Sequence, residues 1–193
     1  MARPREFDTD DVLEKAMQAF WSGGYAATSL ADLTRAMGIS KSSFYEAFGS
    51  KHALFLATIE RYGETAAERT VGLLENSTWA KGAIAAVFEF VIDGATAEGP
   101  RRGCFINNCA VESASRDGAV ASRVIGCLDR IEAAFENAVS RGQEADDIPS
   151  GHDAQALARF LASSLQGLIV TAKANPDKAK LDDIVRVVLT TLD

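Results

Sequence analysis

The side chains with the clearest chemical potential lie in one short segment, Lys-Ser-Ser-Phe-Tyr-Glu-Ala-Phe, at residues 41–48. The hydroxyls of Ser42 and Ser43 can donate or accept a hydrogen bond at almost any base. Lys41 and Tyr45 suit contacts with phosphate oxygens, which position a protein on DNA without reading its sequence. These residue types predict a surface that binds nucleic acid.

Helical spacing separates this polar surface from a buried one. Phe44, Ala47 and Phe48 are three and four residues apart, so they share one face of a helix and are expected in the core. The serines and the tyrosine then project from the opposite face. A second short apolar pattern precedes the segment, and the turn Gly38-Ile39-Ser40 separates the two. Two short helices joined by a glycine-containing turn form a helix-turn-helix, whose second helix enters the major groove.

Apolar residues recur at helical spacing along the rest of the chain, and no strand-like alternation competes with this pattern. The sequence therefore predicts an all-α fold of about nine helices. Several expected helix starts carry residues that cap a helix, namely Asp8 or Thr9, Ser29 with Asp32, Ser40 and Ser50. With approximate ends, the expected helices cover residues 10–22, 30–37, 41–48, from 51, from 76, 104–113, 120–141, 153–174 and 177–192.

Two stretches carry a family resemblance: Gly24-Tyr25-Ala26-Ala27-Thr28-Ser29-Leu30, and the run from Ala36 to Lys51. Their residues and spacing closely resemble the signature of the TetR family of transcription regulators, over roughly residues 8–55. The resemblance implies an all-helical homodimer on a near-palindromic operator, acting as a repressor that a small-molecule effector releases. It divides the chain into a helix-turn-helix DNA-binding domain, 1–50, and a helical effector-binding and dimerisation domain, 51–193.

The resemblance also implies which residues meet DNA, with some at phosphate positions and others near bases. The predicted contacts are Thr28, Ser29, Lys41, Ser42, Ser43, Tyr45 and Lys51. Arg3 and Arg5 fit either a minor-groove arm or a disordered tail. Taken without the resemblance, the three helices also fit an ordinary bundle, and Tyr45 also fits a plain surface position.

Two apolar stripes lie on the helices expected at residues 153–174 and 177–192. In the TetR family the last two helices form the dimer interface, and these segments match in position and character. The alternative is that both stripes only close the core of the monomer. The predicted interface consists of Leu157, Phe160, Leu161, Ser164, Leu168, Ile184, Val188 and Leu192.

A cavity between the middle helices is the usual effector site of the family. Aromatic walls with a few polar groups suit a small molecule, although ordinary core packing also accounts for most of the candidates. Asn108 and Glu112 share a helix face and either face the effector, bond each other or bond the start of the helix expected from residue 76. The predicted lining consists of Tyr62, Trp79, Phe88, Cys104, Phe105, Asn108, Glu112 and Gln166.

The segment from Gly103 to Glu112 resembles a Gly-Cys…Asn…Glu motif in a branch of the family that includes regulators of electrophile response. A nearby cation lowers the pKa of a thiol and favours the reactive thiolate. An alternative function is therefore a sensor thiol at Cys104, activated by Lys173 or by the Arg101-Arg102 pair. The competing interpretation is a buried, inert cysteine.

Composition restricts the other classes of protein. The chain has 193 residues and a net charge of −7, and the acidity lies mainly in its C-terminal part. No run reaches the roughly 18 apolar residues of a membrane span, and no secretory signal begins the chain. Three cysteines suit a reducing cytoplasm. His52 and His152 lack a partnered nucleophile, and no phosphate loop or metal-ligand motif is present, so we expect no enzyme, cofactor or metal site.

Overall fold

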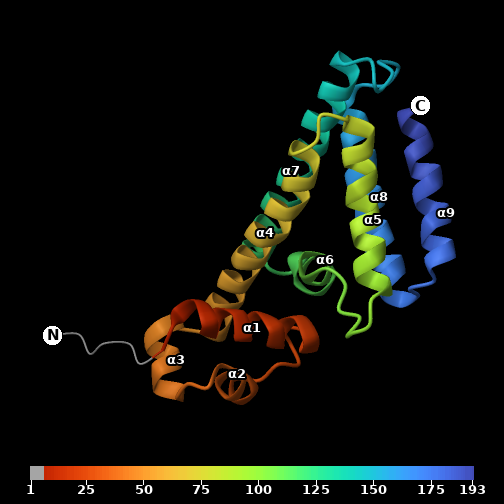
Figure 1. Cartoon of the computed structure of the whole chain (residues 1–193). Helices are drawn as coiled ribbons and strands as arrows, with labels where there is room; N and C mark the ends of the chain where they lie inside the picture. Colours follow the sequence, from red (N-terminus) through yellow and green to blue (C-terminus); the bar gives the residue numbers. More distant parts are fainter. Residues whose placement is uncertain (1–6) are drawn as a thin grey trace.

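The computed structural model describes residues 7–193. Over these residues the chain forms nine α-helices, one π-helical turn, one 3-10 turn and no strand, which confirms the all-α prediction. Helices α1–α3 form a bundle at one end, called here the N-terminal bundle, and the other helices form an elongated body above it (Figure 1). The bounds are α1 Thr9–Gly23, α2 Leu30–Met37, α3 Lys41–Phe48, α4 Lys51–Glu75, α5 Ala80–Thr96, α6 Phe105–Cys109, α7 Gly118–Glu144, α8 Ala154–Ala174 and α9 Lys178–Leu189.

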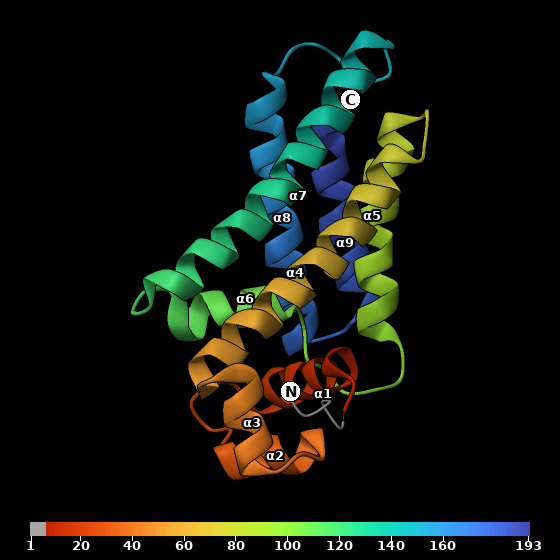
Figure 2. The same cartoon turned by 90° about the vertical axis from the view of Figure 1, so that its left-hand side faces the viewer.

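Helix α4 joins the bundle to the body. It packs against α1 at its lower end and runs beside α7 along its length (Figures 1 and 2). Helix α5 contacts α7, α8 and α9, so these helices form the far side of the body. The short α6 lies between the body and the bundle (Figure 1). The body therefore meets the bundle through α4 and through the segment that contains α6.

The N-terminal bundle forms its helix starts with its own side chains, as the sequence predicts. The side chain of Asp8 accepts from the Asp10 amide, Ser40 from Ser43, and Ser50 from Ala53. Helix α2 begins with a reciprocal capping box between Ser29 and Asp32. Each cap satisfies an amide that has no partner inside its helix. Below them, the bundle core holds the buried side chains Phe20, Leu33, Met37 and Phe44.

The turn between α2 and α3 depends on Gly38. This residue has φ +69° and ψ +27°, the left-handed conformation that residues with a Cβ rarely adopt. Its amide lies 3.3 Å from the carbonyl of Arg35 and ends α2. The chain then reverses over two residues, so α3 begins at the correct angle to pack Phe44 inward.

Helix α5 begins later than the sequence predicts. We expected it from residue 76, but it starts at Ala80, and Trp79 at its N-cap provides no side-chain hydrogen bond. The cap comes instead from the loop between α7 and α8: Asp147 accepts from the Lys81 amide at 2.9 Å and from the Trp79 indole at 3.1 Å. A cap supplied from 66 residues away leaves no local signal in the sequence.

The helix expected over residues 104–113 is divided in two. Helix α6 ends at Cys109, and a π-helical turn, Ala110–Ala114, follows it. A π turn adds a residue to the helical repeat and so changes the direction of later side chains. As a result, Asn108 and Glu112 do not face the same partner.

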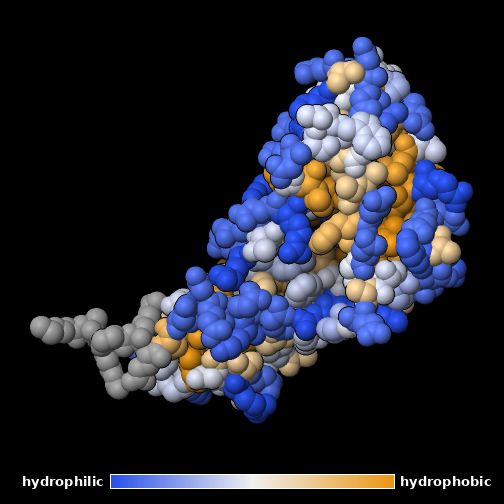
Figure 3. Space-filling view, in the orientation of Figure 1, coloured by the Kyte–Doolittle hydropathy of each residue, from blue (hydrophilic) through white to orange (hydrophobic). Residues whose placement is uncertain are grey.

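The long apolar segments all lie inside the packed fold. None of the helices among residues 7–193 combines the length and the hydropathy that crossing a bilayer requires. Hydrophobic residues do reach the surface of the body, where they flank α5 in the view of Figure 3.

Candidate functional site

The outer face of α3 is polar and accessible. Lys41 and Ser42 are exposed, Ser43 is half-buried, and Tyr45 has 49% of its surface exposed. The Oγ atom of Ser40 lies 2.8 Å from that of Ser42 and 2.9 Å from that of Ser43. These hydroxyls therefore hold one another at the surface, where water or a base edge can replace each bond.

Two of the predicted DNA contacts have structural duties. Thr28 is only 6% exposed, and its hydroxyl donates to the carbonyl of Gly24 at 2.6 Å. Its side chain therefore stabilises the turn between α1 and α2, and its role as a phosphate contact stays a prediction. Ser29 is exposed, but its hydroxyl donates to Asp32 in the capping box. These hydrogen bonds hold the pKa of Asp32 below its ordinary 3.8.

Lys51 lies at the start of α4, beside the reading face. Its Nζ is 4.4 Å from the centre of the Tyr25 ring, at the distance of a cation–π contact. The ring orients the ammonium without neutralising it, so the charge remains available to a phosphate.

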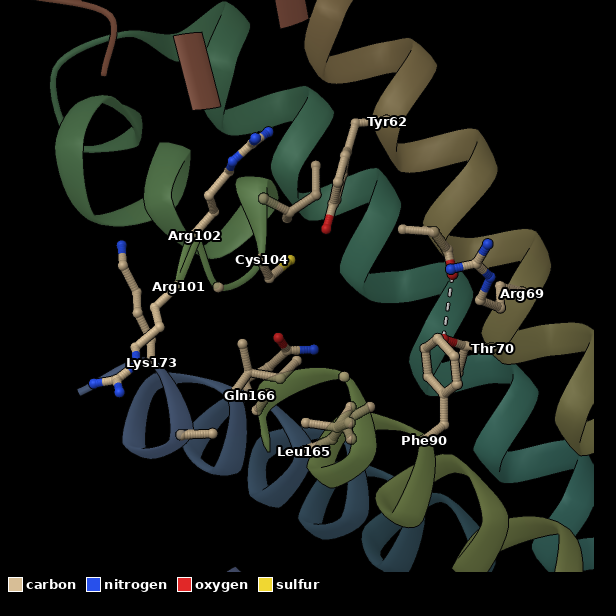
Figure 4. A pocket seen from close by; sticks show the side chains of 18 of the residues that line it. Tyr62, Arg69, Thr70, Phe90, Arg101, Arg102, Cys104, Leu165, Gln166 and Lys173 are labelled. Carbon is tan, nitrogen blue, oxygen red and sulfur yellow. Dashed lines mark hydrogen bonds between the residues drawn. The ribbon is translucent and has the colours of Figure 1, made fainter. Parts of the chain in front are cut away.

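The body encloses a cavity of about 470 Å³. Its walls come from α1, α4, α5, α7, α8 and the loop before α6, and Figure 4 shows the side chains that face it. Three of the eight predicted lining residues belong to this wall: Tyr62, Cys104 and Gln166. The volume falls in the range of small-molecule sites.

Five predicted lining residues lie elsewhere, and their assignment to the cavity wall is corrected. Phe88 and Phe105 are fully buried core residues. The prediction failed for them because an aromatic side chain can fill a core as well as line a pocket. Trp79 is 63% exposed at the start of α5. Asn108 accepts from Lys173 Nζ at 2.8 Å and donates to the Arg102 carbonyl at 3.0 Å. Glu112 points toward the N-terminal bundle.

Glu112 makes the most specific contact between body and bundle. Its two carboxylate oxygens accept from the amides of Tyr25 and Ala26 at 3.1 and 2.9 Å. A Cβ on Gly24 would lie 3.1 Å from the same carboxylate, and Gly24 has φ +77°. The turn after α1 is therefore built to receive this side chain. Sequence reasoning selected Glu112 but gave it the wrong partner.

A second contact joins α4 to α7. His52 Nε2 lies 2.6 Å from Asp117 Oδ2. Asp117 also caps α7, and hydrogen bonds from Val120 and then from His52 hold its pKa below the ordinary 3.8. His52 thus links the start of α4 to the start of α7.

The bundle also contributes to the cavity itself. Trp21 of α1 lines it and packs edge-on against Tyr62, with ring centres 5.0 Å apart. Arg102 lies 5.5 Å above the Trp21 ring and donates to Gln18, also on α1. Trp21 was not among the predicted lining residues, although a large aromatic residue just outside the buried stripe of its helix could have indicated it. The cavity therefore crosses the boundary expected between residues 50 and 51.

Cys104 is half-buried in the cavity wall, and its surroundings favour the neutral thiol. Burial raises its pKa above the ordinary 9.0, and hydrogen bonds from Asn107 and Tyr62 only partly oppose this effect. Of the predicted activating cations, Lys173 donates to Asn108 and Arg102 donates to Gln18. All three cysteines are free thiols.

The two C-terminal stripes largely fill the core of the monomer. Their members Leu157, Leu161, Leu168, Val188 and Leu192 are buried within the single chain, and the dimer interface that includes them stays a prediction. Ser164 is half-buried, while Phe160 and Ile184 are exposed. Val170 of α8 and Val187 of α9 are exposed as well, although the sequence did not single them out.

A helix-turn-helix bundle joined to a helical body that contains a cavity is an architecture of DNA-binding regulators. Comparison with known families gives the same result. Residues 12–58 match the bacterial regulatory proteins of the tetR family, and residues 80–188 match the tetracyclin repressor-like C-terminal domain. The chain belongs to the TetR family of transcription regulators, and it is a regulator rather than an enzyme.

Individual relatives cover the chain from end to end. It is 33% identical to the uncharacterized HTH-type transcriptional regulator YezE of Bacillus subtilis, over 100% of both chains. It is 33% identical to the HTH-type transcriptional repressor ComR of Escherichia coli, over 98% of this chain and 90% of ComR. A solved structure of a cysteine-substituted CifR with 26-bp operator DNA superimposes with a TM-score of 0.87, at 31% identity, over 99% of this chain and 100% of CifR.

Proposed function

We propose that this protein is a homodimeric repressor that an effector in the cavity releases from a near-palindromic operator. The observation that carries the proposal is the exposed hydroxyl face of α3, presented by a helix-turn-helix whose caps fix its geometry. The operator complex of the related CifR supports it. Residues 1–50 would then bind DNA, and residues 51–193 would provide most of the cavity and the dimer contacts. We place this activity in the cytoplasm, where the chromosome lies.

Dimerisation through α8 and α9 follows from the apolar side chains that these helices leave exposed. Phe160 and Val170 lie on α8, and Ile184 and Val187 lie on α9. Exposed apolar groups gathered on neighbouring helices suit burial against a second copy. A dimer would place two α3 helices about 34 Å apart, one turn of duplex DNA.

Release would act through the contacts between body and bundle. Trp21 and Tyr62 touch each other in the cavity wall, and α1 and α4 carry them. An effector that binds one arrangement of these helices more tightly shifts the population toward it. Operator affinity would fall because the distance between the two α3 helices of the dimer would no longer match one turn of duplex DNA.

Binding of a purified operator fragment tests the DNA-reading surface. Ser43→Ala should change base preference, whereas Lys41→Ala should weaken all sequences alike and lower the salt slope by about 0.9 for each phosphate that is no longer neutralised. Lys180→Ala, on α9, removes one surface cation away from α3 and serves as the control. If Ser43→Ala and Lys41→Ala both bind the operator like the wild type and the control, the assignment of the α3 surface to DNA binding is contradicted.

Sedimentation tests the dimer. Phe160→Asp together with Val187→Asp should shift the protein to a monomer, because the interface would have to bury two carboxylates. Val111→Asp is the matched control, since Val111 is 83% exposed on the π-helical turn. A wild-type protein that sediments as a monomer would end the dimer proposal.

A second candidate function keeps the same DNA surface but uses a covalent trigger. It is favoured by one observation: Cys104 lies in the cavity wall (Figure 4), where a bound electrophile would meet its sulfur. The raised pKa predicts slow alkylation at neutral pH. Operator release by N-ethylmaleimide that disappears in Cys104→Ser, but persists in Cys127→Ser, would favour the covalent trigger. Release in both variants would exclude it.

A further inference from the structure

The charges in the cavity wall oppose the charge of the chain. The protein carries a net charge of −7, yet four cationic side chains and one carboxylate line the cavity. Arg101 and Arg102 come from the loop before α6 and Lys173 comes from α8; all three line the cavity, and their charged groups point in different directions in Figure 4. Arg69 lies across the cavity, 5.3 Å above the ring of Phe90.

The three cations of the loop and α8 have no carboxylate within ion-pair distance among residues 7–193. Lys173 Nζ donates to the amide oxygen of Asn108 at 2.8 Å, and Arg102 donates to the amide oxygen of Gln18. Surface cations such as Lys15 and Lys178 lie beside carboxylates. Cations that have no carboxylate partner remain able to form charge-assisted hydrogen bonds, so an anion at this place would be stabilised.

The loop that carries the arginines is shaped around Lys173. Gly103 has φ +66°, and a Cβ there would lie 2.8 Å from Lys173 Cδ. The left-handed backbone at Gly103 favours glycine, and it lets the loop pass close to the Lys173 side chain. This path brings the backbone that carries Arg101 and Arg102 next to Lys173, whose side chain is exposed, as is that of Arg101.

Apart from Arg69, which stacks on Phe90, the wall formed by α5, α7 and α8 is largely apolar and includes Phe90, Leu128, Ile131, Leu165 and Ile169. Two polar atoms in lining residues are buried without a hydrogen-bond partner in the described part of the chain: Trp21 Nε1 and Gln166 Oε1. A buried donor and a buried acceptor left unpaired are the sites at which a bound molecule gains most from a hydrogen bond.

We propose that the cavity binds an amphipathic organic anion. Its acid group contacts Arg101, Arg102 and Lys173, and its apolar or aromatic body fills the space between α5, α7 and α8. The inference rests on the proposed function, because it names the chemical class of the effector. It also links binding to the bundle: an anion competes with Gln18 for Arg102, and Gln18 lies on α1.

A matched pair of fluorescent probes tests the charge requirement. 8-Anilinonaphthalene-1-sulfonate carries an anionic group on an aromatic body, and N-phenyl-1-naphthylamine has the same body without the charge. Charge-assisted hydrogen bonds predict that the full-length protein binds the sulfonate about 10- to 100-fold more tightly. Octanoate should displace the sulfonate, and octanol at the same concentration should not.

Three variants locate the binding site of the anion. Arg101→Gln and Lys173→Gln should each weaken sulfonate binding about tenfold and leave the neutral probe unchanged. Arg116→Gln is the control, because Arg116 is an exposed arginine outside the cavity. Equal affinity for the two probes, or parallel loss of both in the Arg101 and Lys173 variants, would overturn the proposal.

The same protein samples separate this inference from the proposed function. Operator binding is measured without any probe, so its absence refutes the DNA-binding proposal and leaves the probe result standing. Operator binding with no preference for the charged probe refutes the anion proposal alone. Release of the operator by octanoate, but not by octanol, supports both.

Discussion

On the outer face of α3, the hydroxyls of Ser40, Ser42 and Ser43 bind one another at the surface. In the cavity wall, Trp21 Nε1 and Gln166 Oε1 are buried and have no partner within residues 7–193. The first arrangement exchanges its hydrogen bonds with solvent or DNA at little cost, so it favours discrimination between sequences. The second carries a desolvation cost that a bound molecule removes, so it favours affinity for a ligand of matching polarity. The two regions thus prepare for binding in opposite ways.

The largest expected difference between the two regions concerns the effects of replacing one phenylalanine in each. Phe44 is fully buried in the N-terminal bundle, whereas Phe90 is 45% exposed in the cavity wall. Phe44→Ala should lower the free energy of unfolding by about 3–5 kcal/mol and abolish operator binding. Phe90→Ala should change stability by less than about 1 kcal/mol but weaken binding of 8-anilinonaphthalene-1-sulfonate. Urea denaturation and probe titration measure both. Similar losses of stability in the two variants would mean that the bundle core and the cavity wall are packed equally tightly.

Glu112→Gln tests the contact between the regions. The carboxylate accepts two backbone hydrogen bonds, and the amide can accept only through its one oxygen. We expect a loss of about 1–2 kcal/mol, reduced from the buried value by partial exposure. Hydrogen exchange at the Tyr25 and Ala26 amides should accelerate. Glu89→Gln, an exposed glutamate of α5, provides the control. Unchanged exchange at both amides would show that Glu112 does not fasten the bundle.

Alkaline pH should affect the body before the bundle, because all three cysteines follow residue 100. Burial raises the pKa of Cys109 to about 12 and that of Cys127 to about 11, from 9.0. The unfolded chain ionises these thiols above pH 9 while the folded protein keeps them neutral. Their contribution to stability is therefore complete below pH 9 and is lost as the pH rises toward 11–12. Between pH 8 and pH 10 we expect a loss of about 1 kcal/mol for each thiol.

Urea unfolding at the two pH values measures this loss, and Cys127→Ala should show a smaller difference between them. A difference as large as that of the wild type would assign the pH dependence to other groups.

The smallest expected effect concerns the unpaired oxygen of Gln166. Gln166→Met keeps the length of the side chain and removes the buried acceptor, so unfolding should require about 1 kcal/mol more free energy. Gln143→Met is the matched comparison, because the Gln143 amide donates to the carbonyls of Pro149 and His152. That variant should lose a similar amount. A loss of stability in both variants would mean that Gln166 Oε1 has a partner, and the contrast with the α3 surface would weaken.

The sequence predicted the bundle in detail because its signals are local. Ser40 and Ser50 cap helices that begin at the next residue, and the turn glycine lies two residues before Ser40. In the body, α7, α8 and α9 also begin with local aspartate caps, but the start of α5 and the contact with the bundle could not be predicted in this way. The cap of α5 comes from Asp147, and Glu112 bonds a residue 87 positions away.

Aromatic residues were a poor guide to the cavity. Phe88 and Phe105 are of the same residue type as lining aromatics and occur at similar helical spacing, yet both pack into the core. Tyr62 lines the cavity and Phe105 does not because of how the neighbouring helices are arranged. No short pattern in a single sequence predicts that arrangement.

The indole of Trp21 belongs to α1 and also closes one side of the chamber in the body. Chimeras made by grafting a foreign DNA-reading module onto this scaffold would replace that indole, together with Gln18, and so alter which molecules the receptor accepts. To change the DNA sequence specificity alone, a chimera should therefore replace α2 and α3 and retain the native α1.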